Sequence, residues 1–427
     1  MTTSNQGVST ARATSWSVAP GRAYVWVWLP GATSPVVAGR LDAVPGNVVT
    51  FTYGRSYLAR DDAIALYEPE LPLRRGRIDP LRGLRMASAI RDAGPDAWGQ
   101  RVILARRSHH LTDSSDTGSI DQLSYLLESG SDRVGALDFQ ASPTEYEPRQ
   151  ERAQLAELQQ AAQALEAGNV LPEPVATALL RGTSIGGARP KVLLEDDGRQ
   201  LIAKLSSTSD PYPVVKAEAV GMELAGRAGV QVPPSELVTS LGRDVLLVER
   251  FDRTSLAGER RLLVSALTML QLDEMFARYA SYADLADIIR SRFTEPQATL
   301  RELFTRIVLN ICIGNTDDHA RNHAAFWDGQ QLTLTPAYDL CPQPRSGEEA
   351  AQAMEIGRPG LRTSQLRVCL DAAPTYQLDR QEARSIVDAT VTTIEDQWDD
   401  AANAAHLTQL ERRQLWRNQI LSPFIFY

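Results

Sequence analysis

Cysteine is scarce in this sequence, and long apolar runs are missing from it. The three cysteines, Cys312, Cys341 and Cys369, include no CxxC pair. Their odd number and their spacing argue against a disulfide framework and against a thiolate zinc site. No segment approaches the ~20 apolar residues that a membrane helix requires, and the polar N-terminus lacks the apolar core of a signal peptide. These absences predict a cytoplasmic protein with no membrane contact.

Positive charge is also in deficit. The formal net charge is -9 at pH 7, so the chain as a whole offers no attraction for a phosphate backbone, and DNA is not expected as its sole partner. Apolar residues at 43 % and charged residues at 23 % are close to the average of globular proteins. A chain of 427 residues is too long for one ordinary core, so two or three domains are expected.

The secondary-structure signals change along the chain. Short runs such as AYVWVWL and NVVTFTY, separated by Pro, Gly and Asn, predict antiparallel strands near the start. RQERAQLAELQQAAQALEAGN predicts a helix, mixed signals follow as far as Arg253, and amphipathic helices with one hairpin dominate beyond Leu262. These signals predict an α+β fold with a flexible tail, a β-rich N-terminal subdomain, a mixed α/β lobe and a helical lobe, at residues 1–20, 21–139, 140–255 and 256–427.

A glycine-rich loop precedes a predicted β-hairpin. RGTSIGGARPKVLLEDDGRQLIAKLSS reads as a loop, a strand from Val192, a turn at EDDG and a second strand that contains Lys204. Period-two alternation places Leu201, Ala203 and Leu205 on one face of the second strand. Lys204 is therefore expected to point from the other face of a rigid element.

The loop and the lysine together suit a phosphate group. Backbone amides around Gly182, Gly186 and Gly187 can approach phosphate oxygens because no Cβ intervenes, and the ammonium of Lys204 can meet the same phosphates. An exposed turn with a surface lysine is the alternative, and this segment alone leaves both readings open.

Two downstream segments are candidates for the same site. The helix VVKAEAVGMELAGRAGV carries Glu218 and Glu223, and either can pair with Lys204 if the helix packs beside the hairpin. For Glu223 we favour a solvent-exposed helix face. The strand DVLLV leads into ERFDR, whose backbone can face a planar ring or enter the core.

Polar side chains are most concentrated in CIGNTDDHARNHAAFWDGQQLTLTPAYDL. A helix with apolar residues at spacings of three and four leads into this stretch and is expected to end at Gly314. Asp328 and Gly329 suit a two-residue hairpin turn. Since such a hairpin returns the chain toward its origin, Asn322 and Asp339 are expected to lie near one another.

Three interpretations of this stretch compete. His319 and His323 resemble half of a zinc site, although the glutamate of HExxH and an obvious third ligand are missing. A structural polar turn is the second interpretation. The third is phosphoryl transfer, because Asp317 and Asn322 have the D-x-x-x-x-N spacing of a kinase catalytic loop and Asp339 follows where a second magnesium ligand is needed. We favour the third because it uses most of the residues.

Phosphoryl transfer also explains why these residue types are required. The charge of ATP must be neutralised and the acceptor hydroxyl oriented. Magnesium prefers oxygen ligands and commonly takes only one or two carboxylates, which suits Asp339 and Asn322. Asp317 can accept the hydroxyl proton, Lys204 can hold the α- and β-phosphates, and Asp318 then serves only to shape the loop.

In this order, the motifs resemble the HipA family of bacterial serine/threonine kinases, the toxins of type II toxin-antitoxin systems. The resemblance lies in TSIGGARPKVLL, LIAKLS, LLVERFDR, GNTDDHARNH and TPAYDL, and upstream in RLDAVPGNVVTFTYGRSYLARDDAIALYEPELPLR and DRVGALDF. It implies a protein-kinase-like, two-lobed α+β fold in which residues 140–255 form the nucleotide-binding lobe and 256–427 the mainly helical catalytic lobe. H-R-D is absent and YDL replaces D-F-G, so a conventional activation-loop switch is not expected.

The resemblance implies roles for single residues. Asp317 is implied as the catalytic aspartate, and Asn322 and Asp339 as magnesium ligands. The implied contacts with ATP are at Lys204, Gly186, Gly187, Glu249, Phe251, Asn322 and Asp339. Ser184 corresponds to the serine that family members autophosphorylate, and a phosphate there adds about -1.5 to -2 charges to the loop that cradles ATP. Self-inactivation is the resulting hypothesis.

The function predicted on this basis is that of an ATP- and magnesium-dependent serine/threonine protein kinase, a toxin associated with persistence. The implied partner is a HipB-like antitoxin, with DNA reached only through it, and the implied target is a translation protein such as an aminoacyl-tRNA synthetase. Two alternatives stay open. One is a catalytically inert, antitoxin-binding co-repressor component, and the other is a small-molecule or lipid kinase with the same nucleotide machinery.

Overall fold

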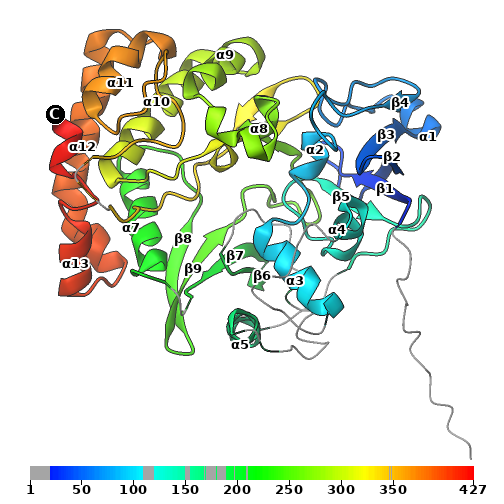
Figure 1. The fold of residues 1–427 in the computed structure, drawn as a ribbon, viewed down its shortest axis with the longest axis horizontal. Helices are drawn as coiled ribbons and strands as arrows, with labels where there is room; N and C mark the ends of the chain where they lie inside the picture. The colour runs from blue at the N-terminus through cyan, green and yellow to red at the C-terminus, as the bar shows by residue number, and fades with distance from the viewer. Residues whose placement is uncertain are drawn as a thin grey trace, which may run out of the picture.

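The structure of the chain is a computed structural model. It describes residues 20–108, 120–149, 154–167, 169, 179, 189–196, 198–207, 210–345, 347 and 349–427. Within these residues there are three antiparallel β-sheets and a helical C-terminal region (Figure 1). The predicted glycine-rich loop, with Gly182, Ser184, Gly186 and Gly187, lies outside the described residues, as does the predicted tail up to residue 19.

The N-terminal region forms a five-stranded sheet in the order β4-β3-β2-β1-β5. Its strands are β1 (Arg22–Val27), β2 (Val36–Val44), β3 (Val48–Tyr53), β4 (Arg77–Ile78) and β5 (Leu137–Gln140). Alternating apolar side chains of β1, such as Ala23, Val25 and Val27, are fully buried, as period-two patterning requires. The helices of this region are α1 (Arg55–Leu58), α2 (Ser88–Arg91), α3 (Ala97–Ser108) and α4 (Gln122–Glu128).

A four-stranded sheet follows, in the order β6-β7-β9-β8. Its strands are β6 (Lys191–Asp196), β7 (Arg199–Leu205), β8 (Ser235–Ser240) and β9 (Arg243–Glu249), and the helices beside it are α5 (Leu155–Glu166) and α7 (Val214–Arg227). The predicted alternation in β7 is confirmed, because Leu201, Ala203 and Leu205 are buried while Ile202 and Lys204 are only partly so.

The C-terminal region is mainly helical. It contains α8 (Ala266–Met269), η3 (Glu274–Tyr279), α9 (Tyr282–Arg292), α10 (Pro296–Ile313), η4 (Ala320–Asn322), α11 (Leu366–Ala372), η5 (Ala373–Tyr376), α12 (Arg380–Ala404), α13 (Gln409–Leu415) and η6 (Pro423–Phe426). A small sheet, β10 (Leu263–Ser265), β11 (Ala324–Trp327) and β12 (Leu332–Leu334), lies among these helices. Figure 1 shows the four-stranded sheet between the N-terminal sheet and the C-terminal helices. No described helix combines the length and the apolar character needed to cross a membrane.

The predicted hairpin after the acidic stretch is present, but its turn is longer than expected. Trp327 pairs with Leu332, so the loop holds the four residues 328–331 and not two. The carboxylate of Asp328 accepts the amides of Gln330 and Gln331 at 2.8 Å each, and the amide of Asp328 donates to the carbonyl of Gln331 at 3.4 Å, so the turn pairs its own polar groups.

Helix α10 ends as predicted at Gly314, which adopts a left-handed conformation with φ of 72°. A Cβ at this position would lie 2.5 Å from the carbonyl oxygen of Gln419, so glycine is required for space as well as for conformation. The amide of Leu421 donates to the carbonyl of Cys312 at 2.7 Å. A segment near the C-terminus therefore supports the start of the acidic loop.

Buried ion pairs connect the N-terminal region to the chain after β9. Asp132 accepts hydrogen bonds at 2.8 Å from both Arg250 and Arg253, and Asp252 accepts from the same two arginines. Asp252 also accepts the amide of Gly135 at 2.7 Å. Because the arginines outweigh the effect of burial, the pKa of Asp252 is lowered to about 2. The segment that continues from β9 is thus fixed against the N-terminal region.

Replacement of Asp132 by alanine leaves Arg250 and Arg253 buried with Asp252 as their remaining carboxylate. We expect the free energy of unfolding to fall by about 3–5 kcal/mol, because breaking a buried ion pair strands an uncompensated charge. Urea unfolding followed by circular dichroism measures this loss. Asp42→Ala is the matched control, since Asp42 also accepts from two arginines but at the surface. Equal losses of unfolding free energy in the two variants would contradict the buried ion pairs of Asp132 with Arg250 and Arg253.

Candidate active site

Lys204 lies at the centre of the candidate site. Its strand, β7, is paired on both sides, with β6 and with β9, so the side chain projects from a rigid position. The ammonium donates hydrogen bonds to Glu218 of α7 and to Asp339, which follows β12. Of the two glutamates proposed for Lys204, Glu218 makes the pair, whereas Glu223 pairs with Arg227 at 2.8 Å, as expected for an outer helix face.

In this triad the charge of Lys204 stabilises both carboxylates, which repel one another. Burial alone would lower the pKa of Lys204, but the carboxylates of Asp339 and Glu218 outweigh it and raise that pKa. Desolvation alone would raise the pKa of Asp339, but Lys204 and Lys191 outweigh it and hold that pKa at about 2. Burial raises the pKa of Glu218 in spite of Lys204. Lys204 and Asp339 are therefore both ionised at neutral pH.

Asp339 is placed by its backbone neighbours. Its φ is 59°, in the left-handed region that few residues other than glycine adopt. The next carbonyl, of Leu340, lies against Gly221 of α7, where a Cβ would be only 1.9 Å from the carbonyl oxygen. The side-chain amide of Asn315 donates to the carbonyl of Asp339 at 3.3 Å. The approach of α7 to this segment sets the distance from Glu218 to Asp339.

The acidic loop is anchored by Asp318. This buried carboxylate accepts hydrogen bonds from Tyr282 of α9, from Asn310 of α10 at 2.6 Å and from His323 at 2.9 Å. Although burial opposes it, His323 and these hydrogen bonds lower the pKa of Asp318. The prediction that Asp318 shapes the loop is confirmed. Of its three partners, Tyr282 comes from a segment that the sequence did not connect to it.

Asp317, by contrast, is exposed. Partial desolvation of its carboxylate and the negative charges of Asp339 and Asp318 raise its pKa. Asn322 is buried, and its side-chain amide donates to the carbonyl of Asp317 at 3.4 Å. The loop thus exposes the carboxylate of Asp317, while the hydrogen bond from Asn322 to the Asp317 carbonyl holds the backbone of the turn.

The predicted approach of the two ends of the hairpin is confirmed. The hydroxyl of Tyr338 donates to the carbonyl of Arg321 at 2.7 Å. This bond joins the residue before Asp339 to the residue before Asn322. The structure therefore brings Lys204, Glu218 and Asp339 into direct contact and holds the Asp317–Asn322 loop beside them.

The zinc interpretation is not supported. His323 Nε2 is hydrogen bonded to Asp318, and its ring packs edge to face on Tyr282 at 5.6 Å between centroids. His319 precedes η4 while His323 follows it, so the two histidines do not share a helical face. Among the described residues no group of three or more His, Cys, Asp or Glu side chains is arranged to hold a metal ion.

The segment implied for adenine begins where β9 ends. Glu249 is the last residue of β9, and its amide donates to the carbonyl of Pro234 at 2.9 Å. Phe251 packs on Tyr338, with ring centroids 5.7 Å apart. Since Tyr338 precedes Asp339, this segment lies beside the triad.

Sequence reasoning missed Lys191. The predicted strand began at Val192, but β6 begins one residue earlier, and Lys191 pairs directly with Lys204 in the ladder. The predicted turn at EDDG implies this register, so the sequence already indicated that Lys191 lies opposite Lys204. Lys191 is buried and donates to Asp96 at 3.2 Å. Asp96, just before α3, was also missed.

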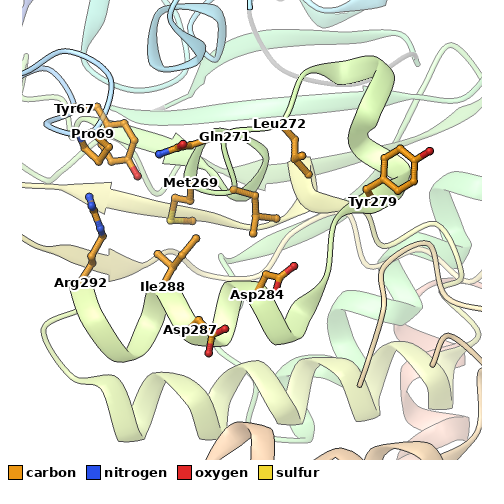
Figure 2. A pocket seen from close by; sticks show the side chains of 11 residues that line it. Tyr67, Pro69, Met269, Gln271, Leu272, Tyr279, Asp284, Asp287, Ile288 and Arg292 are labelled. Carbon is orange, nitrogen blue, oxygen red and sulfur yellow. The ribbon is translucent and has the colours of Figure 1, made fainter. Parts of the chain in front are cut away.

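A separate pocket of about 400 Å³ lies between the N-terminal region and helices α8 and α9 (Figure 2). Its lining includes Tyr67, Met269, Asp284, Ile288 and Arg292. Figure 2 shows Met269 and Ile288 near its centre, with Tyr67 and Arg292 at one end. None of the sequence-predicted site residues lines this pocket.

Two family signatures match the chain. The HipA N-terminal domain matches residues 27–140, and the HipA-like C-terminal domain matches residues 183–398. The class that this fold and these matches define is that of the HipA-like kinases. The chain belongs to the HipA family.

Individual relatives are distant. The chain is similar to the putative kinase Y4mE of Sinorhizobium fredii, with 28% identity over 265 residues, which cover 56% of this chain and 60% of that protein. It is also similar to the serine/threonine-protein kinase toxin HipA of Shewanella oneidensis, with 26% identity over 183 residues, which cover 37% of this chain and 42% of that protein. The matched stretches thus span about half the length of these relatives.

The fold is similar to a solved structure. HipA of Shewanella oneidensis, in its complex with HipB and operator DNA, superposes with a TM-score of 0.64 and 19% identity, covering 92% of this chain and 96% of that one. The predicted α+β fold, with a β-rich N-terminal part and a helical C-terminal part, is confirmed.

Gly221→Ala is expected to disrupt the triad. A methyl group would overlap the carbonyl oxygen of Leu340, so α7 and the segment that carries Asp339 must move apart. We expect the free energy of unfolding to fall by about 1–3 kcal/mol, as for other overpacked sites. Gly226→Ala on the same helix is the control, because its nearest atom is 3.4 Å away. It should raise stability by up to about 1 kcal/mol through helix propensity. Chemical unfolding distinguishes the two, and similar effects would refute the close contact.

Asp339→Asn should change the pH dependence of stability. The pKa of Asp339 is about 2 in the folded chain and roughly 3.9 in an unfolded one. A depressed folded pKa contributes stability that is fully present above the unfolded value and is lost as pH falls toward the folded value. The difference in unfolding free energy between the native chain and the variant should therefore shrink between pH 5 and pH 2.5, measured by urea unfolding. A difference that stays constant would contradict the ion pair with Lys204.

Proposed function

We propose that this chain is an ATP-dependent serine/threonine protein kinase that acts as a HipA-like toxin. The observation that carries the proposal is the position of Lys204, whose ammonium contacts Glu218 on one side and Asp339 on the other. A strand lysine paired with a helix glutamate, near an aspartate that follows the acidic loop, is the arrangement that kinases use to hold nucleotide phosphates. Membership of the HipA family supports it.

In this proposal Lys204 contacts the α- and β-phosphates while Glu218 holds its side chain in place. The Lys204 side chain is 20% exposed and that of Glu218 only 8%, so the glutamate supports the lysine from the inner side. Gly186 and Gly187 are proposed to offer backbone amides to the phosphates. Glu249 and Phe251 are proposed to border the adenine.

The oxygen donors beside Lys204 fit a magnesium ion. The side chain of Asp339 is 41% exposed and its carboxylate stays ionised down to a pKa of about 2. Hard cations prefer carboxylate and amide oxygens. We therefore assign Asp339 and Asn322 as the residues that hold magnesium, which neutralises the charge of the triphosphate when bound.

Asp317 is proposed to orient the acceptor hydroxyl and to accept its proton. Its raised pKa makes the carboxylate a better proton acceptor than an ordinary aspartate. The anchored side chain of Asp318 keeps the loop in place during this step. Ser184, in the glycine-rich loop, is proposed as the site of autophosphorylation, and its phosphate would repel the nucleotide.

The partners proposed for this chain follow from its family. The solved HipA of Shewanella oneidensis is bound to HipB and operator DNA, and we propose a HipB-like antitoxin as the partner here, with DNA reached through it. The proposed acceptor is a translation protein such as an aminoacyl-tRNA synthetase. Both ATP and such a target occur in the cytoplasm, which is where the proposal places the chain.

Incubation with γ-labelled ATP and magnesium tests the proposal. The native chain should transfer label to itself or to a protein in a lysate, and Asp317→Ala should lower the rate by at least about 100-fold, because loss of a proton acceptor typically costs that much. Ser184→Ala should abolish self-labelling while it leaves transfer to other proteins. Glu223→Ala is the control, since its ion pair lies on the outer face of α7.

The outcomes separate the alternatives. ATP binding without transfer to any protein would indicate the inert antitoxin-binding component and would refute the kinase proposal. Transfer only to extracted metabolites or lipids would indicate a small-molecule or lipid kinase. Mass spectrometry of phosphoproteins after expression of the native chain and of Asp317→Ala identifies the acceptor.

A further inference from the structure

Asp96 belongs to the N-terminal region, yet it reaches the nucleotide-binding sheet. It immediately precedes α3, and one carboxylate oxygen accepts the amide of Gly99 at 2.7 Å, which caps the first turn of that helix. The other oxygen accepts a hydrogen bond from Lys191 of β6 at 3.2 Å. The side chains of Asp96 and Lys191 are 8% and 5% exposed. The contact therefore joins the two family domains in a buried setting.

Lys191 lies directly opposite Lys204 in the β6–β7 ladder. Side chains at such positions share one face of the sheet, with Cβ atoms about 4.5–5.5 Å apart. The two ammonium groups therefore repel one another, and nearby carboxylates offset this repulsion. Lys204 has Glu218 and Asp339, and Lys191 has Asp96. The N-terminal region thus supplies one of the counter-charges that this pair of lysines needs.

The position of Asp96 is rigid. Trp98, Val102 and Ile103 of α3 belong to one apolar cluster with Val192 of β6 and Ala203 of β7. This packing joins α3 to the sheet, and the capping bond to Gly99 fixes the carboxylate on the end of that helix. The ion pair between Asp96 and Lys191 also fixes the orientation of α3 on the sheet, because apolar packing is not directional.

We propose that Asp96 is a positioning residue of the nucleotide site, which holds the ammonium of Lys191 beside that of Lys204 so that both face the triphosphate. The inference rests on the proposed function of that site. It makes the N-terminal region a part of the nucleotide site, although no residue of that region was assigned to it. A displacement of α3 relative to the sheet would accordingly change the affinity for ATP.

Asp96→Asn and Asp96→Ser test the proposal, because Asn and Ser both still cap α3 and neither carries the negative charge. We expect each to weaken binding of ATP on the order of tenfold, the size of coupling usual between contacting charged residues, with binding of adenosine unchanged. Isothermal titration calorimetry with the full chain measures both ligands. Asp96→Glu, which restores the charge, should recover part of the affinity for ATP.

A matched control comes from Asp92, another carboxylate that links the N-terminal region to the rest of the chain. It accepts hydrogen bonds from the hydroxyls of Ser265 and Thr268, at 2.9 and 2.7 Å. Asp92→Asn should lower stability without changing the ratio of the affinities for ATP and adenosine. In a Lys191→Met background, Asp96→Asn should have little further effect on that ratio.

Four results would overturn the inference. Equal weakening of ATP and adenosine binding would show that Asp96 acts only through folding, and unchanged ATP binding would show that it does not act at all. Either result leaves the proposed kinase function standing. Failure of the native chain to bind ATP would refute both. If Asp96→Asn does not fold, Asp96→Ser gives the same comparison, and failure of both to fold, with Asp92→Asn folded, would assign Asp96 to stability alone.

Discussion

The ammonium of Lys204 joins three segments that are far apart in the sequence. Lys204 comes from β7, Glu218 from α7 and Asp339 from the chain after β12. Each charge is at least partly desolvated, so removal of any one leaves the others in an unfavourable environment. The three are stable together only at one spacing, and the contact between Gly221 and the carbonyl of Leu340 sets it. Every role proposed for the acidic loop depends on this geometry.

Carboxylates of the N-terminal region take part in several of its contacts with the rest of the chain. Asp92 contacts Ser265, Asp96 contacts Lys191 and Asp132 contacts Arg250. Apolar packing holds surfaces together without fixing their angle, whereas hydrogen bonds to charged groups depend on direction. Three such contacts, spread over the interface, fix the orientation of the N-terminal region. If Asp96 positions Lys191 as proposed, that orientation also sets the geometry of the nucleotide site.

Sequence patterns predicted the elements and most of the ionisable groups of the site, but not the partners that come from distant segments. The face of Lys204 and the end of α10 follow from periodicity and a stop residue, which act over a few neighbours. Lys191 was missed because the predicted strand begins at Val192, one residue after the start of β6. Asp96 gave no signal, since 95 residues separate it from Lys191. The burial of Asp318 likewise depends on Tyr282, which is 36 residues away. Tertiary packing alone decides such contacts.

The support that Gln419 and Leu421 give to the end of α10 has a consequence for synthesis. A ribosome adds ~5–20 residues per second, so a nascent chain contains Asp317 and Asn322 for about 5–20 s before it contains Leu421. During that interval the carbonyl of Cys312 lacks the hydrogen bond from the Leu421 amide, and the start of the acidic loop lacks the support of Gln419. The kinase activity proposed for the loop would therefore begin only after residues 419–421 have been synthesised.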